Sequence, residues 1–222
     1  MKLDLIYEDD DIVVVDKPSG VITHQANSFK GDDIYHLLVG QGVQIKTSGD
    51  DFRQGIISRL DIGTTGVLIV AKNEHSYISL KQQFSNHSVE KKYTALAVGK
   101  LKQHQALIDA PIGRHPTKRA LFAVVDDGKP AKTQYKILQE FERTTLVEVA
   151  LLTGRTHQIR VHFQAIGHPL YADPLYGTQI EQLGRPFLHS SSLTVVHPTT
   201  NSKMTFTSEL PLKLRVALDM QK

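Results

Sequence analysis

The sequence predicts an α+β fold with a mixed or largely antiparallel sheet and a few helices. Three observations lead to this prediction: segments typical of strands dominate, recognisable helices are few, and strand and helix do not alternate regularly along the chain. A doubly wound parallel sheet would require that alternation. No linker or internal repeat divides the 222 residues, so we expect a single domain over residues 1–222.

Two buried strands are expected in the first part of the chain. Residues 12–15 (Ile-Val-Val-Val) form a β-branched run that ends at the turn signal Lys17-Pro18-Ser19-Gly20. Residues 67–71 form a second apolar run behind the glycine-flanked turn of residues 63–66. Between the two runs, residues 40–54 are rich in Gly, Ser, Thr and Asp, which is typical of a surface loop.

Helices are recognised by apolar residues at helical spacing. One helix is predicted by three residues at i, i+3 and i+7, namely Tyr77, Leu80 and Phe84. The clearest helix starts at Thr156, with an apolar stripe of Ile159, Phe163 and Ile166 and a stop at Gly167 and Pro169. Further strands are expected at residues 93–98, 145–152 and 192–196, and a short terminal helix at residues 211–220.

The composition narrows the class of protein. Hydrophobic residues make up 40% of the chain, enough for a core, and the net charge of +3 permits a polyanionic partner without requiring one. The absence of cysteine excludes disulfides, iron–sulfur clusters, cysteine-ligated zinc and thiol nucleophiles. No apolar stretch has the length of a membrane span or signal peptide, so we expect a soluble cytoplasmic protein.

One group of polar residues in apolar surroundings precedes the second buried strand. In an extended segment Arg59 and Asp61 project to the same side, and an arginine beside a carboxylate favours the ionised acid. Such a carboxylate at the rim of an apolar sheet is a candidate nucleophile or base. The alternative is a structural ion pair that closes a turn.

A second group surrounds the start of the clearest helix, where Arg155, His157, Arg160 and His162 crowd together. A helix amino terminus beside arginines is a ready anion site, and Arg160 lies about one turn inside, from where it can bind a carboxylate in bidentate fashion. A solvated polar helix face is the other interpretation. The two histidines are five residues apart, which does not fit two zinc ligands on one helix face, so no metal is expected.

A third group opens a strand. Tyr93 follows Lys91 and Lys92, so the ring can stack on a nucleobase while the lysines meet phosphates, although an amphipathic strand residue is the plainer interpretation. Residues 114–119 form a basic loop, suited to contacts with a nucleic-acid backbone or else a solvated hairpin tip. The motifs of phosphate loops, dinucleotide folds and serine hydrolases do not occur, so no cofactor is expected.

Taken together, these segments resemble the RluA-type pseudouridine synthases, which isomerise uridine to pseudouridine within structured RNA. The resemblance runs from about Ile6 to about Pro211, with the motifs in the family's order. The segments that carry it are residues 14–20, 59–66 with the strand behind them, 92–99, 153–162, 167–169, 173–177, 188–190 and 197–198.

This resemblance implies the pseudouridine synthase catalytic fold, with its bent sheet, and an isomerase that flips and modifies uridines of ribosomal RNA, transfer RNA or both without a cofactor. It implies that Asp61 is the catalytic carboxylate, that Tyr93 packs on the target base and that Arg160 pairs with Asp61. Arg59 would hold the place that the base vacates. The RNA-binding residues would be Arg59, Arg155, His157, Lys92 and Leu188.

The chain departs from the family's pattern at two positions. Ser58 stands where the family usually has histidine, and Thr65 stands where it commonly has serine. Because Met1 lies almost at the catalytic core, we expect no accessory RNA-binding domain before it, and an enzyme of this size is expected to work as a monomer. Specificity would then rest on local RNA loop shape and splayed bases.

Two other functions remain open on the sequence. A non-catalytic RNA-binding protein of this fold would act as an RNA chaperone, which the intact Asp61, Tyr93 and Arg160 disfavour. A glycoside hydrolase would need paired carboxylates, and Asp173 is the candidate partner for Asp61, although Asp173-Pro174 is more typical of a turn.

Overall fold

The computed structural model describes residues 1–24, 33–47, 54–180 and 182–222, and the chain divides into two compact units. The first unit comprises Met1–Glu90 and Ser190–Glu209, and the second comprises Lys91–His189 and Leu210–Lys222. The expectation of one domain over residues 1–222 stays a prediction, because two units of one chain can still fold as one domain. In the described ranges, no helix is long and apolar enough to cross a membrane.

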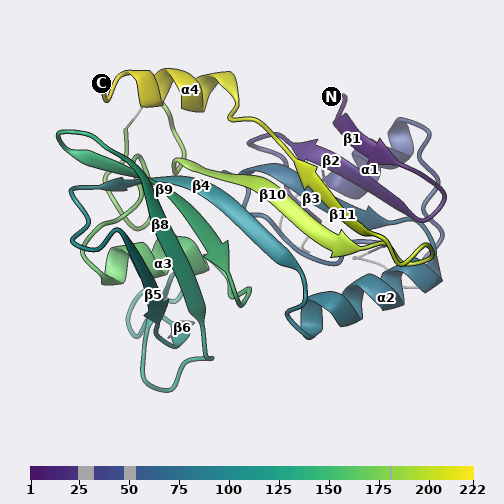
Figure 1. Cartoon of the computed structure of the whole chain (residues 1–222), viewed down its shortest axis with the longest axis horizontal. Coiled ribbons are helices and arrows are strands. Elements are labelled where there is room, and N and C mark those ends of the chain that lie inside the picture. Colours follow the sequence, from purple (N-terminus) through teal and green to yellow (C-terminus); the bar gives the residue numbers. More distant parts are fainter. Residues whose placement is uncertain (25–32, 48–53, 181) are drawn as a thin grey trace. The chain divides into compact units, whose positions relative to one another are not determined.

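The first unit is a sheet with two helices among its described residues (Figure 1). The strands lie in the order β1 (Asp4–Glu8), β2 (Ile12–Lys17), β3 (Thr65–Ala71), β10 (Leu188–Val196) and β11 (Lys203–Thr207). β2 pairs antiparallel with both β1 and β3, and β11 pairs antiparallel with β10. The helices are α1 (Ile34–Gly40) and α2 (Glu74–Ser85).

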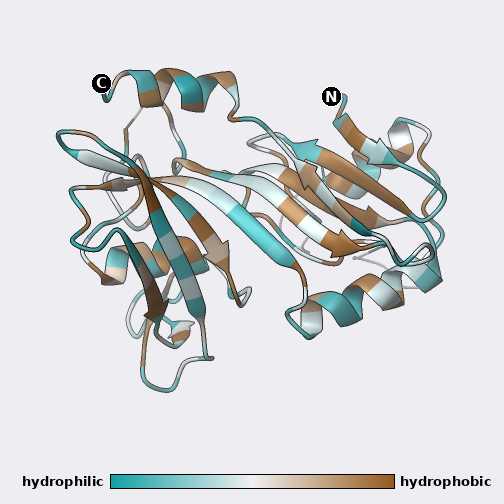
Figure 2. Cartoon of the chain, viewed as in Figure 1, coloured by the Kyte–Doolittle hydropathy of each residue, from teal (hydrophilic) through white to brown (hydrophobic). Residues whose placement is uncertain are grey.

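The two strands predicted from β-branched runs form the centre of this unit. β3 is buried along its whole length and β2 at every position except Asp16, as continuous apolar runs predict, and Figure 2 shows hydrophobic residues along both strands. The predicted helix is also confirmed: Leu80 of α2 is fully buried in the same core, and Tyr77 and Phe84 pack against it. The predicted loop of residues 40–54 begins where α1 ends, and its residues 48–53 lie outside the described residues.

β3 starts with a close approach of two backbones. Gly66 has φ +110°, and a Cβ added there would lie 2.1 Å from the carbonyl oxygen of Ser190. Neither the backbone conformation nor the space admits a side chain. This glycine therefore lets β3 lie against β10 directly after the loop that contains Asp61.

The second unit contains an antiparallel sheet in the order β4, β9, β8 and β5. Their bounds are β4 (Glu90–Val98), β5 (Gln105–Asp109), β8 (Lys132–Glu140) and β9 (Thr144–Leu151). A separate hairpin is formed by β6 (Ile112–Arg114) and β7 (Phe122–Val124), so the basic loop of residues 114–119 is a hairpin tip. The helices are α3 (Gln158–Ala165) and α4 (Leu212–Asp219), and the latter is the predicted terminal helix.

The helix expected from Thr156 begins later and is buried on several sides. α3 starts at Gln158 because His157 adopts φ 57°, a left-handed conformation through which a right-handed helix cannot run. Residues 158–163 are all buried. The predicted apolar stripe is wrong at Ile166, which follows the last helical residue and is 36% exposed.

The element order and pairing confirm the α+β class with a mixed, mostly antiparallel sheet. Strands occur in runs, such as β4 to β9, and helices are not interleaved regularly with them. The pairs β1–β2, β2–β3, β10–β11, β4–β9, β8–β9, β5–β8 and β6–β7 are all antiparallel.

Candidate functional site

The predicted site residues are divided between the two units. Arg59 and Asp61 belong to the first unit. The second unit contains the others, which are Lys92, Tyr93, Arg155, His157, Arg160 and Leu188.

Asp61 lies half-buried in a loop that leads into β3, and its backbone is anchored on both sides. Before it, the hydroxyl of Thr23 donates to the carbonyl oxygen of Leu60 at 2.8 Å and accepts from the Leu60 amide at 3.1 Å. After it, the Thr64 amide donates to the carbonyl oxygen of Asp61 at 2.9 Å. Hydrogen bonds from the Thr23 hydroxyl and the Thr64 amide to the loop backbone therefore hold this loop. Arg59 is exposed.

Lys17 is a further anchor of the same loop and was given no role by the sequence. Its side chain is fully buried at the end of β2. The ammonium group donates to the carbonyl oxygens of Thr64 at 2.9 Å, Pro18 at 3.1 Å and Ile62 at 3.5 Å. The Gly20 amide donates to the Ile62 carbonyl as well, at 2.8 Å. The turn after β2 and the loop after Asp61 are thus held together by one buried cation.

In the second unit, Arg160 forms a buried bidentate ion pair with Asp173. Its Nε lies 2.8 Å from Oδ2 and its Nη2 lies 2.8 Å from Oδ1, with Asp173 0% and Arg160 5% exposed. Burial by itself raises the pKa of Asp173, but the hydrogen bonds and charge of Arg160, together with the amides of Leu175 and Tyr176, outweigh it. The pKa of this carboxyl therefore lies below its ordinary value.

Asp173 is thus a residue whose importance sequence reasoning missed. The turn expected at Asp173-Pro174 exists, since the carboxylate accepts the amides of Leu175 and Tyr176. The turn signal does not reveal that Asp173 pairs with Arg160 of α3. A carboxylate that accepts four hydrogen bonds and stays ionised is poorly suited to act as the second acid of a glycoside hydrolase. The pairing of Arg160 with Asp61 stays a prediction.

Tyr176 connects several of these residues. Its ring lies under the guanidinium of Arg160, with 5.0 Å from Cζ to the ring centroid. Its hydroxyl oxygen is 2.8 Å from Nδ1 of His157 and accepts the Phe122 amide at 3.0 Å. The left-handed residue before α3, the start of β7 and the buried arginine therefore share one aromatic side chain.

The remaining residues around α3 have structural partners. Nε of Arg155 donates to the carbonyl oxygen of Pro130 at 3.0 Å, and the Arg155 amide donates to Oε1 of Gln158 at 2.9 Å. Buried His162 has Nδ1 2.8 Å from the Thr133 hydroxyl and Nε2 2.9 Å from the Ala110 carbonyl oxygen. Burial lowers the pKa of His162, so the ring is neutral and belongs to the core.

The strand group lies on β4, and its neighbouring side chains point to opposite faces. Tyr93 is buried and pairs with Val149 of β9. Lys92 is exposed, with its ammonium 3.4 Å from the carboxylate of Glu148. Leu188, at the start of β10, is buried. Tyr93 and Lys92 therefore serve different faces of the strand.

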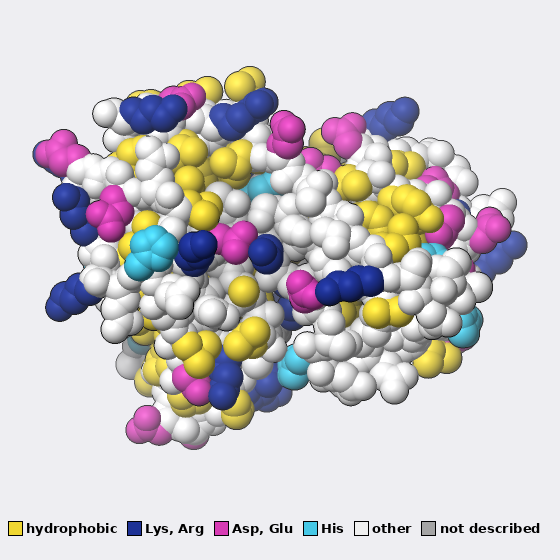
Figure 3. All heavy atoms as spheres, viewed as in Figure 1, with side chains coloured by type: hydrophobic (Ala, Val, Ile, Leu, Met, Phe, Trp, Pro, Cys, Tyr) yellow, Lys and Arg dark blue, Asp and Glu magenta, His cyan; other side chains and the backbone are white. Residues whose placement is uncertain are grey.

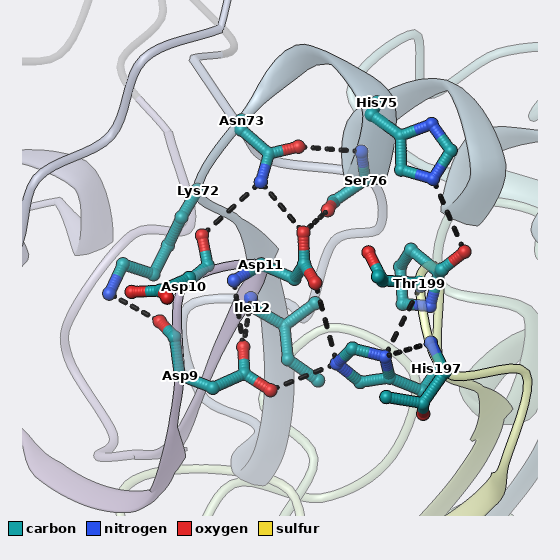
Figure 4. Close-up of polar contacts among 12 residues, drawn as sticks. Asp9, Asp10, Asp11, Ile12, Lys72, Asn73, His75, Ser76, His197 and Thr199 are labelled. Atoms are coloured by element: carbon teal, nitrogen blue, oxygen red, sulfur yellow. Dashed lines mark hydrogen bonds and ion pairs between the residues drawn. The ribbon is translucent and has the colours of Figure 1, made fainter.

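One cluster in the first unit has the composition of a metal site. Ligand atoms of Asp9, Asp11 and His197 lie within 4.8 Å of one another (Figure 4). However, Nδ1 of His197 accepts the amides of Thr199 at 3.3 Å and Thr200 at 3.1 Å, so Nε2 carries the proton and donates to Asp9 at 2.9 Å. The nitrogen that a metal would need is already a donor. The cluster ties the turn after β1 to the turn after β10.

Charges of both signs are interspersed on the face shown in Figure 3, where Lys and Arg side chains lie among Asp and Glu side chains. This agrees with the net charge of +3. Electrostatic attraction for a polyanion is therefore a matter of particular side chains rather than of net charge.

Known proteins resemble this chain over most of its length. A family model described as RNA pseudouridylate synthase matches residues 11–165. An uncharacterized RNA pseudouridine synthase of Mycobacterium bovis is 42% identical over 219 residues, which cover 96% of this chain and 71% of the relative. A ribosomal large subunit pseudouridine synthase D of Nitrosomonas europaea is 39% identical over 218 residues, which cover 94% of this chain and 62% of the relative.

Solved structures show the same fold at lower identity. Human RNA pseudouridylate synthase domain containing 4 has a TM-score of 0.76 and 23% identity, covering 97% of this chain and 92% of that one. Human RNA pseudouridylate synthase domain containing 1 has a TM-score of 0.74 and 24% identity, covering 100% of this chain and 96% of that one.

Proposed function

Since the chain belongs to the RNA pseudouridylate synthase family, we propose that it converts specific uridines of ribosomal RNA, transfer RNA or both to pseudouridine through the carboxylate of Asp61. Family membership makes the chain an RNA-modifying isomerase. Beyond family membership, we propose the class of target RNA and the catalytic role of Asp61. The observation that carries it is the loop of Asp61, whose backbone is fixed on both sides while the residue stays half-buried.

The chemistry requires an ionised carboxylate. The bond from the ribose to N1 of uracil breaks, the base rotates, a new bond forms from the ribose to C5, and the proton on C5 is lost. A carboxylate can assist by attacking the anomeric carbon or by removing a ribose proton to give a glycal. Both routes leave a carboxylate at the end of the cycle, and neither needs an oxidant or a reductant.

Arg160, Tyr93 and Arg59 are proposed to assist Asp61. A uridine must leave its stack before it can react, at a cost of about a few kcal/mol. Packing of the base on Tyr93 and occupation of the gap by Arg59, which is exposed, would offset that cost. Arg160 would provide the counter-charge that keeps Asp61 ionised.

The remaining predicted residues are proposed to bind the RNA backbone and the neighbouring bases. Exposed Lys92 and partly exposed Arg155 and His157 are suited to phosphate contacts, and Leu188 would line the pocket of the base. Relatives named ribosomal large subunit pseudouridine synthase D favour a ribosomal target. We further propose that the chain acts in the cytoplasm as a monomer without metal, as its size and lack of cysteine suggest.

Tritium release from uridine C5 tests the proposal. Ribosomal and transfer RNA transcripts, and ribosomal large subunits, would be labelled at C5 and incubated with wild type, Asp61→Asn and the control Asp4→Asn, which alters an exposed aspartate of β1. Wild type and Asp4→Asn are expected to release tritium, and Asp61→Asn is expected to bind RNA without releasing it.

Each other outcome has a definite meaning. Release by Asp61→Asn at the wild-type rate would contradict the role of the carboxylate. Binding without release by wild type, on every substrate, would favour an RNA chaperone that keeps the fold. The substrate that responds would identify the class of target RNA.

A further inference from the structure

We infer that Asp173 is a positioning residue for the reaction, because its carboxylate fixes the guanidinium of Arg160 in one orientation while the ring of Tyr176 holds the same group from its face. The inference rests on the proposed function, since the orientation of Arg160 matters to catalysis only if Arg160 assists Asp61. All three residues belong to the second unit.

The edge of the guanidinium is held first. Nε and Nη2 of Arg160 donate to the two different oxygens of Asp173, each at 2.8 Å. Two parallel hydrogen bonds define both the position and the plane of the group, which a single contact would not do. A lysine at position 160 would supply the positive charge, but its ammonium group is not planar and could not bind both oxygens in this fixed orientation.

The carboxylate that holds Arg160 is itself fixed by the backbone. Oδ1 of Asp173 also accepts the amides of Leu175 at 2.9 Å and Tyr176 at 3.2 Å. The Asp173 carbonyl oxygen accepts the Gly177 amide at 3.0 Å, and the Asp173 amide donates to the Leu170 carbonyl at 3.2 Å. The backbone of the turn therefore orients the Asp173 carboxylate, and this carboxylate in turn orients the guanidinium of Arg160.

The face of the guanidinium is held by Tyr176. The distance from Cζ of Arg160 to the ring centroid is 5.0 Å, within the range of a cation–π contact. The ring cannot easily turn away, because its hydroxyl lies 2.8 Å from Nδ1 of His157 and accepts the Phe122 amide at 3.0 Å. Arg160 is thus contacted from two directions, along its edge by Asp173 and on its face by Tyr176.

Burial explains why such a device is needed. Arg160 is 5% exposed, and a buried guanidinium without a counter-charge would be driven out of the core or would pull water in. Asp173 makes the cation compatible with burial, and the ordering of a long side chain is completed during folding rather than during the reaction. We therefore expect Asp173 to affect the chemical step and not the affinity for RNA.

Single-turnover tritium release at saturating enzyme measures the chemical step, and filter binding measures affinity. Asp173→Asn is expected to lower the single-turnover rate by about 10-fold to 100-fold, the effect of misplacing a catalytic group, with the RNA dissociation constant within about 3-fold of wild type. Asp109→Asn is the matched control, because Asp109 also forms an ion pair, with Lys132 at 3.1 Å, but is exposed. Its rate is expected to equal that of wild type.

A double-mutant cycle separates positioning from a general structural effect. If Asp173 acts through Arg160, then Arg160→Lys combined with Asp173→Asn is expected to be no slower than the slower single variant. Multiplying losses would overturn the inference, and so would a wild-type rate for Asp173→Asn. Absence of release by wild type would instead overturn the proposed function, so the two failures are distinguishable.

A second pair of variants covers the case in which Asp173→Asn does not fold, as judged by circular dichroism. Tyr176→Leu removes the ring beneath Arg160, whereas Tyr176→Phe keeps the ring and removes only the hydroxyl. Tyr176→Leu is expected to lower the single-turnover rate more than Tyr176→Phe. Both variants lose the contact between the hydroxyl and His157, so any change in RNA affinity is expected to be the same in the two. Equal rates for the two variants would overturn the inference.

Discussion

Replacement of Lys17 by methionine tests whether the buried ammonium group holds the loop of Asp61. Methionine is similar in length and fits an apolar environment, but it has no donor. The change therefore removes the hydrogen bonds to the carbonyl oxygens of Thr64, Pro18 and Ile62 while filling much of the same space.

The size of the effect follows from what each carbonyl retains. Ile62 keeps the amide of Gly20 as a donor, and Pro18 is partly exposed and can bind water. The hydrogen bond to the Thr64 carbonyl oxygen is buried, so the main cost of the substitution is the loss of this bond. Depriving a buried acceptor of its donor costs about 1–3 kcal/mol, so we expect the free energy of unfolding to fall by that amount.

Urea unfolding followed by circular dichroism would measure this loss, with Lys81→Met on the exposed face of α2 as the control. We also expect the turnover number for tritium release to fall with little change in RNA affinity, because the loop and not the RNA contacts is disturbed. A Lys17→Met variant with wild-type stability and turnover would refute the reasoning, since the carbonyl contacts would then be dispensable.

Two further predictions concern pH and salt. Burial raises the pKa of Asp9, but hydrogen bonds, including that from His197, outweigh it and hold the pKa below its ordinary value of 3.8. Asp9 therefore stabilises the fold above that value and ceases to do so as the pH falls through its lower folded-state pKa. Asp9→Asn should lose about 2 kcal/mol of unfolding free energy at pH 7, and this difference from wild type should shrink as the pH falls below 3.8, whereas a difference independent of pH would exclude this role. For RNA binding, Lys118→Ala in the exposed hairpin tip should reduce the slope of log affinity against log salt by roughly 0.7–0.9, and an unchanged slope would remove Lys118 from the interface.

The elements predicted correctly from the sequence are those whose signal is local. The β-branched runs of β2 and β3 and the helical spacing in α2 depend on neighbours in sequence, and each was found. β8 was not predicted, although Thr133, Tyr135 and Ile137 alternate with exposed residues, because those intervening residues break any apolar run. The sequence of β8 does contain an alternation of period two, which is typical of a strand with one buried face.

Features that depend on tertiary contacts were beyond the sequence pattern. The start of α3 is set by the left-handed conformation of His157, whose ring is held by Tyr176. The partner of Arg160 likewise depends on how the turn at Asp173 folds back onto the helix. The position of Arg160 on the helix indicates that it can bind a carboxylate, but the sequence spacing does not identify which carboxylate is its partner.

Asp173 and Asp61 show that environment, rather than residue type, determines the role of an aspartate. Asp173 is fully buried, and its two oxygens accept two hydrogen bonds from Arg160 and two from backbone amides, so any approach by a substrate would first have to break these bonds. Asp61 is half-buried, and the hydrogen bonds that fix its loop go to the backbone. A carboxylate that must attack or remove a proton needs the second arrangement, in which hydrogen bonds to the backbone fix the loop and the residue is not fully buried. A carboxylate that must hold a cation in place needs the first. The difference supports the proposals that Asp61 carries out the reaction and that Asp173 positions Arg160.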